Sequence, residues 1–367
     1  MRIVTYEPAL FPALAAAARD AAAGHSLAHR PFVDHYYATA PWCRLYLALA
    51  DDGAVAGAIG IEQLRFEYEG RPLTIGCASN FVAFRRGAGG VLFLRWVRSS
   101  EVACIYGGSP DTHRILEHQR WTYFPGVRIY RLNGRYASRH AEPLWRGVAK
   151  SLLRAATPPV DVGGRLRHAI GRGALPAVGA EEVGGFSEDM LPRAGGFALR
   201  LAPGVAYLDW RYSRALSFVR YRLFRLVRGE PCGYVVLNEH PGSLVVAQAD
   251  GPDPETLAAG VLAAVARVAG DGSRQPEVVL ASSHARMRRV YEGFGFRPAR
   301  VERPFALGSA RGPVMLGRDT SSWLVNFDWT DNGLRPPFLD QDAARPEARE
   351  RRRLVARWRR HAASPAS

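Results

Sequence analysis

The chain has 367 residues, of which 47% are hydrophobic and 23% charged, a globular composition long enough for two domains with separate cores. Its 37 glycines and 25 prolines are close to average usage, which excludes a collagen-like or wholly disordered chain. The net charge is +15, but most of the excess lies in residues 145–172 and 345–361, which argues against a uniformly basic groove for nucleic acid.

The first half of the chain is predicted to begin with strands and to continue with alternating helices and strands. An Asp-Asp-Gly turn at residues 51–53 and a Glu-Gly-Arg-Pro turn at 69–72 predict two hairpins. A glycine-rich turn at 85–90 precedes apolar residues at helical spacing. In chain order, the predicted elements are strands over 45–49, 54–61 and 73–84, a helix through 92–97, a strand over 102–106, a helix over 110–121 and a strand over 122–132.

The second half repeats this order of elements. An Arg-Gly-Glu-Pro turn at 228–231 separates two strand-like runs, and Asp253 with Pro254 has the form of a helix start. Strands separated by helices at these lengths predict a mixed α/β sheet flanked by helices in each half. The predicted elements are strands over 221–227, 232–238 and 243–249, a helix from 254, a strand over 278–281, a helix over 284–294 and a strand over 297–307.

Composition divides the chain into four parts. We predict a first domain over residues 1–136, a basic linker over 137–190, a second domain over 191–319 and a C-terminal extension over 320–367. The linker is expected to hold one amphipathic helix, through Leu144, Val148, Leu152 and Leu153. The basic linker and extension favour solvated arms or contact with an anionic membrane surface, and no specific nucleic-acid partner is expected. No pattern indicates an oligomeric state.

The turn at 85–90 predicts a phosphate site. Glycines let the backbone approach a ligand closely, and the amides at the start of a helix attract an anion. Arginine side chains add charge-assisted hydrogen bonds to phosphate. Leu92 stands where a dinucleotide fingerprint would have its third glycine, so a Rossmann site is not favoured. The candidate ligand-binding residues are Arg85, Arg86, Gly87, Ala88, Gly89 and Gly90.

Four short segments resemble the motifs of one known family. Val-Tyr-Glu-Gly-Phe-Gly-Phe (290–296) lies in the last predicted helix, and Ile-Leu-Glu-His-Gln-Arg-Trp (115–121) lies in the corresponding helix of the first half. Tyr-Leu-Asp-Trp-Arg-Tyr (207–212) precedes the second domain, and the turn at 85–90 follows a central strand. Together with the order of elements, these segments resemble the GNAT superfamily of acyl-CoA-dependent N-acyltransferases, which implies two GNAT-like domains in tandem.

The resemblance implies an N-acyltransferase that uses acetyl-CoA or another acyl-CoA as co-substrate. Its acceptor would be a small-molecule amine, such as an amino sugar or a cell-envelope precursor. The first domain would bind acyl-CoA, because Asp250, Asp253 and Glu255 stand at the corresponding turn of the second. Carboxylates at a helix start compete with phosphate for the same amides. The second domain would therefore shape the acceptor cleft.

Candidate acid and base groups come from both halves. In this family a tyrosine on the last helix protonates the departing thiolate, and the resemblance puts Tyr291 at that place in the second domain and Leu116 in the first. Tyr291 lies on an apolar helical face typical of a core, so it would act only if the second domain is active. Within the first domain, Glu62 and Tyr106 end apolar strands and His113 lies in the first turn of a helix, which makes them the catalytic candidates.

Other classes are disfavoured or remain as alternatives. Lys150 is the single lysine, which argues against a P-loop and a lysine Schiff base. The four cysteines lack zinc-like spacing, so no metal is expected. Buried thiols and the lack of a spanning apolar run predict a cytoplasmic protein. One alternative is a Fem-like transferase that takes its acyl group from aminoacyl-tRNA. Another is a non-catalytic GNAT-like binding protein.

Overall fold

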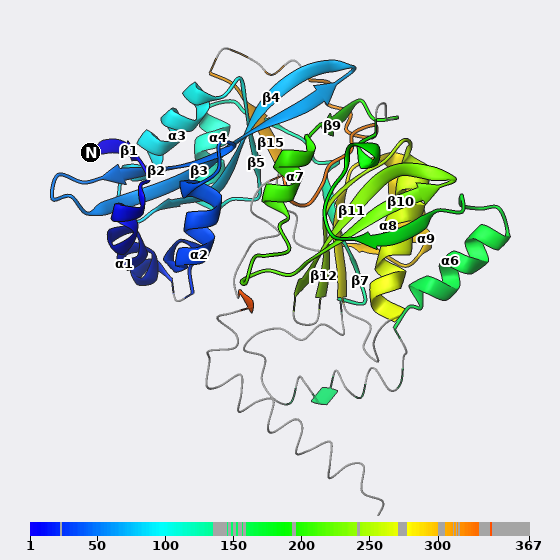
Figure 1. The fold of residues 1–367 in the computed structure, drawn as a ribbon. Coiled ribbons are helices and arrows are strands. Elements are labelled where there is room, and N and C mark those ends of the chain that lie inside the picture. The colour runs from blue at the N-terminus through cyan, green and yellow to red at the C-terminus, as the bar shows by residue number, and fades with distance from the viewer. Residues whose placement is uncertain are drawn as a thin grey trace, which may run out of the picture.

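Two mixed sheets flanked by helices confirm the predicted α/β fold class. The computed structural model describes residues 1–22, 24–134, 159–192, 196–240, 243–270, 277–299, 305–329 without 311, 313 and 315, and 338–339, with a few isolated residues between 145 and 156. The two sheets lie side by side, and helix α7 (Val205–Arg211) lies between them (Figure 1). The helix predicted through Leu144 and Leu153 lies largely outside the described residues.

The first sheet has the order β1-β2-β3-β4-β5-β15-β6, with β9 paired to β3. Its strands are β1 (Arg2–Thr5), β2 (Cys43–Leu49), β3 (Val55–Tyr68), β4 (Arg71–Ala83), β5 (Val102–Tyr106), β6 (Thr122–Tyr123), β9 (Leu199–Leu201) and β15 (Phe305–Gly308). Helices α3 (Ala88–Ser99) and α4 (Pro110–His118) cover one face, and α1 (Phe11–Ala21) and α2 (Arg30–Val33) cover the other (Figure 1). A short η2 turn (Ser26–Ala28) joins α1 to α2.

The second sheet has the order β14-β7-β13-β12-β11-β10-β8. Its strands are β7 (Arg128–Leu132), β8 (Gly179–Val183), β10 (Tyr221–Arg228), β11 (Glu230–His240), β12 (Ser243–Asp250), β13 (Glu277–Ser282) and β14 (Arg297–Pro298). Helices α8 (Pro254–Gly270) and α9 (Ala285–Gly293) pack on one face, and α6 (Val162–Gly171) packs on α8. The opposite face of this sheet shares a core with the first sheet and α7.

The two halves exchange their closing strands, which corrects the sequence-based expectation. A single strand over 122–132 was expected to close the first unit and one over 297–307 the second. Instead β7 pairs with β13 in the second sheet, and β15 pairs with β5 and β6 in the first. Pro125 and Gly126 interrupt the first run, because proline lacks the N–H that a ladder needs. Each sheet is therefore completed by a strand from the other half of the chain.

Parts of the predicted linker and extension are integral to the fold. Within residues 137–190, α6 buries Val162 and Leu166 against α8, and β8 pairs with β10. Residues 320–329, called the C-terminal segment below, are mostly buried, although the sequence placed them in the extension. Residues 340–367 lie outside the described part of the chain. Among the described residues, no helix combines the length and apolar character needed to cross a bilayer.

Candidate functional site

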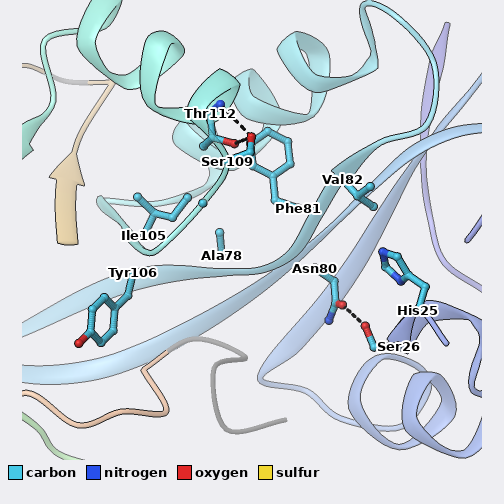
Figure 2. Close-up of a pocket in the computed structure, with 11 residues that line it drawn as sticks. His25, Ser26, Ala78, Asn80, Phe81, Val82, Ile105, Tyr106, Ser109 and Thr112 are labelled. Carbon is cyan, nitrogen blue, oxygen red and sulfur yellow. Dashed lines mark hydrogen bonds between the residues drawn. The ribbon is translucent and has the colours of Figure 1, made fainter. Parts of the chain in front are cut away.

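A cavity opens where two parallel strands of the first sheet separate. β4 and β5 pair only over Ile75–Cys77 and Val102–Cys104, although both strands continue further. The cavity has a volume of about 360 Å³ and lies between these strand ends, the start of α4 and the η2 turn (Figure 2). Its wall is apolar at Ala78, Phe81 and Ile105, and polar at Ser26, Asn80 and Thr112.

A bulge in β4 shapes one wall of this cavity. The ladder to β3 shifts register, so that Asn80 and Phe81 stand opposite Ile59 alone, and Asn80 has a left-handed φ of 47°. The amide side chain holds this conformation: its Oδ1 accepts a 2.5 Å hydrogen bond from Ser26, and its Nδ2 donates to Tyr37 at 2.8 Å. The bulge interrupts the ladder between β3 and β4 beside the cavity, and the bonded amide of Asn80 fixes its shape.

The glycine-rich turn joins β4 directly to α3. Gly87 caps the helix with a φ of 86°, a conformation that glycine adopts without strain. The first amides of a helix have no acceptor within it, and the first turn of α3 carries no acidic residue. A Cβ added at Gly89 would approach only Ala83, at 3.6 Å, and one at Gly90 would meet nothing within 4 Å. The positive end of α3 is therefore open to an anion.

The other residues of the turn differ in their surroundings. Arg85 forms a 2.8 Å ion pair with Asp52 across side chains that are 48% and 58% exposed. Exposed pairs of this kind contribute little to stability, so Arg85 can exchange Asp52 for a ligand at small cost. Arg86 is exposed, whereas Ala88 is fully buried under the first sheet. Backbone amides and the side chains of Arg85 and Arg86 are thus the groups that the turn presents to solvent.

A buried charged cluster lies between the two halves of the molecule. Arg211, at the end of α7, is 3% exposed, and its guanidinium lies 3.3 Å from Glu62 and 3.3 Å from Asp328. Burial alone would lower the pKa of Arg211, but the carboxylates of Asp328 and Glu62 raise it well above its ordinary value. Burial, reinforced by Glu62, raises the pKa of Tyr207, whose hydroxyl donates to that carboxylate at 2.8 Å. The cluster joins β3, α7 and the C-terminal segment.

Comparison with solved structures identifies the fold. No protein-family model matches the chain, and no curated protein matches its sequence. N-myristoyltransferase of Saccharomyces cerevisiae with bound myristoyl-CoA is 12% identical and aligns with a TM-score of 0.50, over 83% of this chain and 82% of that one. The chain has the fold of the GNAT superfamily.

Two GCN5-related N-acetyltransferases also align with this chain, with lower TM-scores. The protein from Kribbella flavida is 15% identical with a TM-score of 0.48, over 83% of this chain and 71% of that one. The protein from Anabaena variabilis is 10% identical with a TM-score of 0.48, over 83% and 72%.

Within this GNAT fold, the three candidates of the first half lie in different surroundings. Tyr106 belongs to the cavity wall, but its ring points away from Thr112 and packs on Phe305 with centroids 5.7 Å apart (Figure 2). His113 follows Thr112 in α4, and its Nε2 lies 3.4 Å from where a Cβ on Gly108 would stand. Glu62 is 1% exposed and belongs to the buried charged cluster. In the described part of the chain, no group of three His, Cys, Asp or Glu residues could hold a metal ion.

In the second GNAT-like sheet, the chain itself fills the space where the parallel strands separate. β12 and β13 stop pairing after Val245 and Val279. The amide of Asn326 then bonds both the N–H and the C=O of Ala249, at 3.0 and 3.1 Å, and the N–H of Asp328 donates to a β12 carbonyl. The C-terminal segment thus occupies the position that corresponds to the cavity of the first sheet.

Two further features separate the second unit from the first. Tyr291 on α9 is 2% exposed and packs on Phe296 in the core beneath the sheet, and burial raises its pKa. At the start of α8, the carboxylate of Asp253 accepts a 2.8 Å hydrogen bond from the N–H of Thr256. This internal cap uses an amide that a phosphate would need.

Sequence reasoning missed two groups that shape the site. Asn80 was not singled out, although Ser79 and Asn80 form a polar pair inside an otherwise apolar strand, which is a signal for a bulge or a ligand. The partnership of Arg211 with Asp328 was also missed. The segment around Arg211 was noted for its family resemblance, but no local pattern indicates which carboxylates it meets.

Proposed function

We propose that this chain is an acyl-CoA-dependent N-acyltransferase that transfers an acetyl or another short acyl group to an amine. The observation that carries the proposal is the cavity between β4 and β5 together with the open N-terminal turn of α3. A CoA thioester needs a slot for its extended pantetheine arm and an anion site for its pyrophosphate. Both features belong to the first half, so residues 1–136, completed by β15, would hold the co-substrate.

Each part of this half would have a separate task. The pyrophosphate would rest on the amides of Gly87, Gly89 and Gly90, with Arg86 alongside. The thioester carbonyl would lie in the cavity, against the bulge at Asn80. The amine attacks the carbonyl carbon, a C–N bond forms, and the C–S bond breaks as the intermediate collapses. Holding the amine and the thioester in a reactive orientation supplies much of the rate enhancement.

The second unit would shape the acceptor site. This assignment is supported by the C-terminal segment, which fills its strand separation, and by Asp253, which caps its helix. The proposed acceptor is an amine-bearing sugar, of the kind found in cell-envelope precursors. A cavity of about 360 Å³ must also accept the pantetheine arm, and this favours acetyl over a long acyl chain.

A thermal-shift series tests the proposed function. The full chain is mixed separately with acetyl-CoA, palmitoyl-CoA and bulk tRNA. A ligand at 100 times its Kd stabilises the folded state by about 2.7 kcal/mol, and this raises Tm by several degrees. We expect acetyl-CoA to raise Tm and tRNA to leave it unchanged. Stabilisation by tRNA alone would instead indicate the Fem-like alternative, and no shift with any ligand would contradict the proposal.

Replacing Tyr291 with phenylalanine is expected to change turnover by less than about threefold. The substitution keeps the ring in the core and removes only a hydroxyl that lies in the second unit. A group that transfers a proton in the reaction contributes on the order of 10²-fold or more. Initial rates with acetyl-CoA measure the effect, and the Tm of the variant serves as the control. A loss of 10²-fold at unchanged Tm would move the active site to the second unit.

A further inference from the structure

One helical segment of the linker presents an apolar face to solvent. Every described residue between 145 and 156 is helical and exposed; these residues, called the linker face below, are Trp145, Val148, Ala149, Leu152 and Ala156. Trp145, Val148 and Leu152 are 65%, 48% and 66% exposed, and they are three of the five large apolar side chains exposed in the described part of the chain. At 3.6 residues per turn, the positions of the linker face fall within an arc of about 100°, so they form a single face.

Basic residues alternate with the linker face along the sequence. Residues 144–157 contain Arg146, Lys150 and Arg154 and no acidic residue. A spacing of four residues puts these three positions on one side of a helix, next to the linker face but outside it. The next helix along the chain, α6, exposes Arg167 as well. An apolar face combined with a basic side is the pattern of a helix that lies in the interface of an anionic bilayer.

Charge distinguishes between the surfaces that could cover the linker face. A second copy of the chain would bring its own basic segment, and a net charge of +15, against the same charges. The C-terminal extension over 340–367 is itself basic, so it would be repelled in the same way. An anionic lipid surface instead attracts each Lys or Arg near it. Residues 144–157 are too few to span a bilayer, which needs about 20 apolar residues, so the contact is expected to run along the surface.

We propose that the linker face binds the interface of a bilayer that contains anionic phospholipids. The apolar side chains of Trp145, Val148 and Leu152 enter the boundary between headgroups and acyl chains. Arg146 and Arg154 pair with lipid phosphates, because their long apolar stems let the charged heads reach headgroup level. Tryptophan favours this depth, since its ring is apolar while its Nε1–H still finds water or a headgroup oxygen. This membrane contact does not depend on catalysis by the first half of the chain.

Vesicle sedimentation of the full chain tests the role of charge. We expect binding to phosphatidylcholine mixed with phosphatidylglycerol at about three to one, and at least about tenfold weaker binding to phosphatidylcholine alone. Each basic residue near an anionic surface strengthens binding about fivefold, so Arg146→Gln with Arg154→Gln should weaken it by about 20-fold. The matched control, Arg19→Gln with Arg98→Gln, removes two exposed charges from the first half and should bind as the parent does. Equal losses in the two variants would overturn the inference, because only net charge would then matter.

Two exposed leucines test the apolar insertion. Leu152 belongs to the linker face, whereas Leu94 is 46% exposed on α3. Leu152→Ser should weaken binding to the mixed vesicles several-fold, because it removes apolar surface that leaves water on binding, and Leu94→Ser should leave binding unchanged. Both side chains are exposed, so neither substitution should lower Tm. Parental binding in L152S would contradict the proposed contact.

Tryptophan quenching locates the contact independently of affinity. Lipids that carry bromine on their acyl chains quench the fluorescence of tryptophans that enter the bilayer. We expect quenching in the parent, which has eight tryptophans, and its loss in Trp145→Phe, which keeps an apolar ring and should still sediment with the vesicles. Quenching that persists in W145F would place the contact elsewhere. Sedimentation equilibrium without lipid supplies the last test: a parental dimer that L152S dissociates would assign the linker face to a second copy and overturn the inference.

Discussion

Replacing Arg211 with methionine is expected to destabilise the protein by about 3–5 kcal/mol, because it leaves Glu62 and Asp328 buried without a counter-charge. Both carboxylates are almost fully buried, so water cannot replace the guanidinium. A loss of this size is a large part of the roughly 5–15 kcal/mol that stabilises a typical folded protein. Urea unfolding, followed by tryptophan fluorescence, measures the change in the free energy of unfolding.

A triple variant provides the control for this prediction. Glu62→Gln and Asp328→Asn remove the two charges that Arg211→Met would strand, so the triple variant should be more stable than the single one. This non-additivity is expected because the three side chains form one contiguous network. It also keeps the test interpretable if the single variant fails to fold. A single variant within 1 kcal/mol of the parent would show that the cluster does not hold the two halves together.

Replacing Gly89 with aspartate is expected to weaken CoA binding by at least about 100-fold. Two unit charges 4 Å apart interact by about 4 kcal/mol at the effective dielectric constant of a protein surface, and a carboxylate at this turn would repel the pyrophosphate. Space is not the obstacle, since a Cβ at this position meets only Ala83, at 3.6 Å. The fold should therefore survive the substitution, and the loss should be confined to binding.

Two matched variants separate charge from bulk in this experiment. Gly89→Asn has the same shape without the charge and should lose much less affinity. Gly171→Asp, at the end of α6, adds the same carboxylate at a position with nothing within 4 Å of its Cβ, and should bind CoA as the parent does. Isothermal titration calorimetry gives the three dissociation constants. Parental affinity in G89D would place the CoA site away from the turn at 85–90.

Local patterns in the sequence were sufficient to predict several of the elements around the candidate site. The hairpin turn at 69–72 is present, with Gly70 in the left-handed region. The apolar stripe after the glycine-rich turn is buried as α3, because its spacing matches the helical period. The turn itself was recognisable, since its backbone conformation requires glycine at Gly87. Residues that are neighbours in the sequence determine such turns and helices. These features can therefore be predicted without knowing which distant segments pack against them.

Which segments meet was decided only by the tertiary structure. Apolar alternation identified the closing strands of both halves but not their sheet, because every sheet edge offers the same unpaired N–H and C=O groups to any strand. The chain crosses at Pro125, and β7 and β15 are exchanged. Likewise, the sequence predicts Glu62 as the polar residue at the end of an apolar strand. Only the folded structure shows that Arg211 lies beside both Glu62 and Asp328. Burial is favourable for such a carboxylate only beside a counter-charge, and the residues that supply it come from distant parts of the chain.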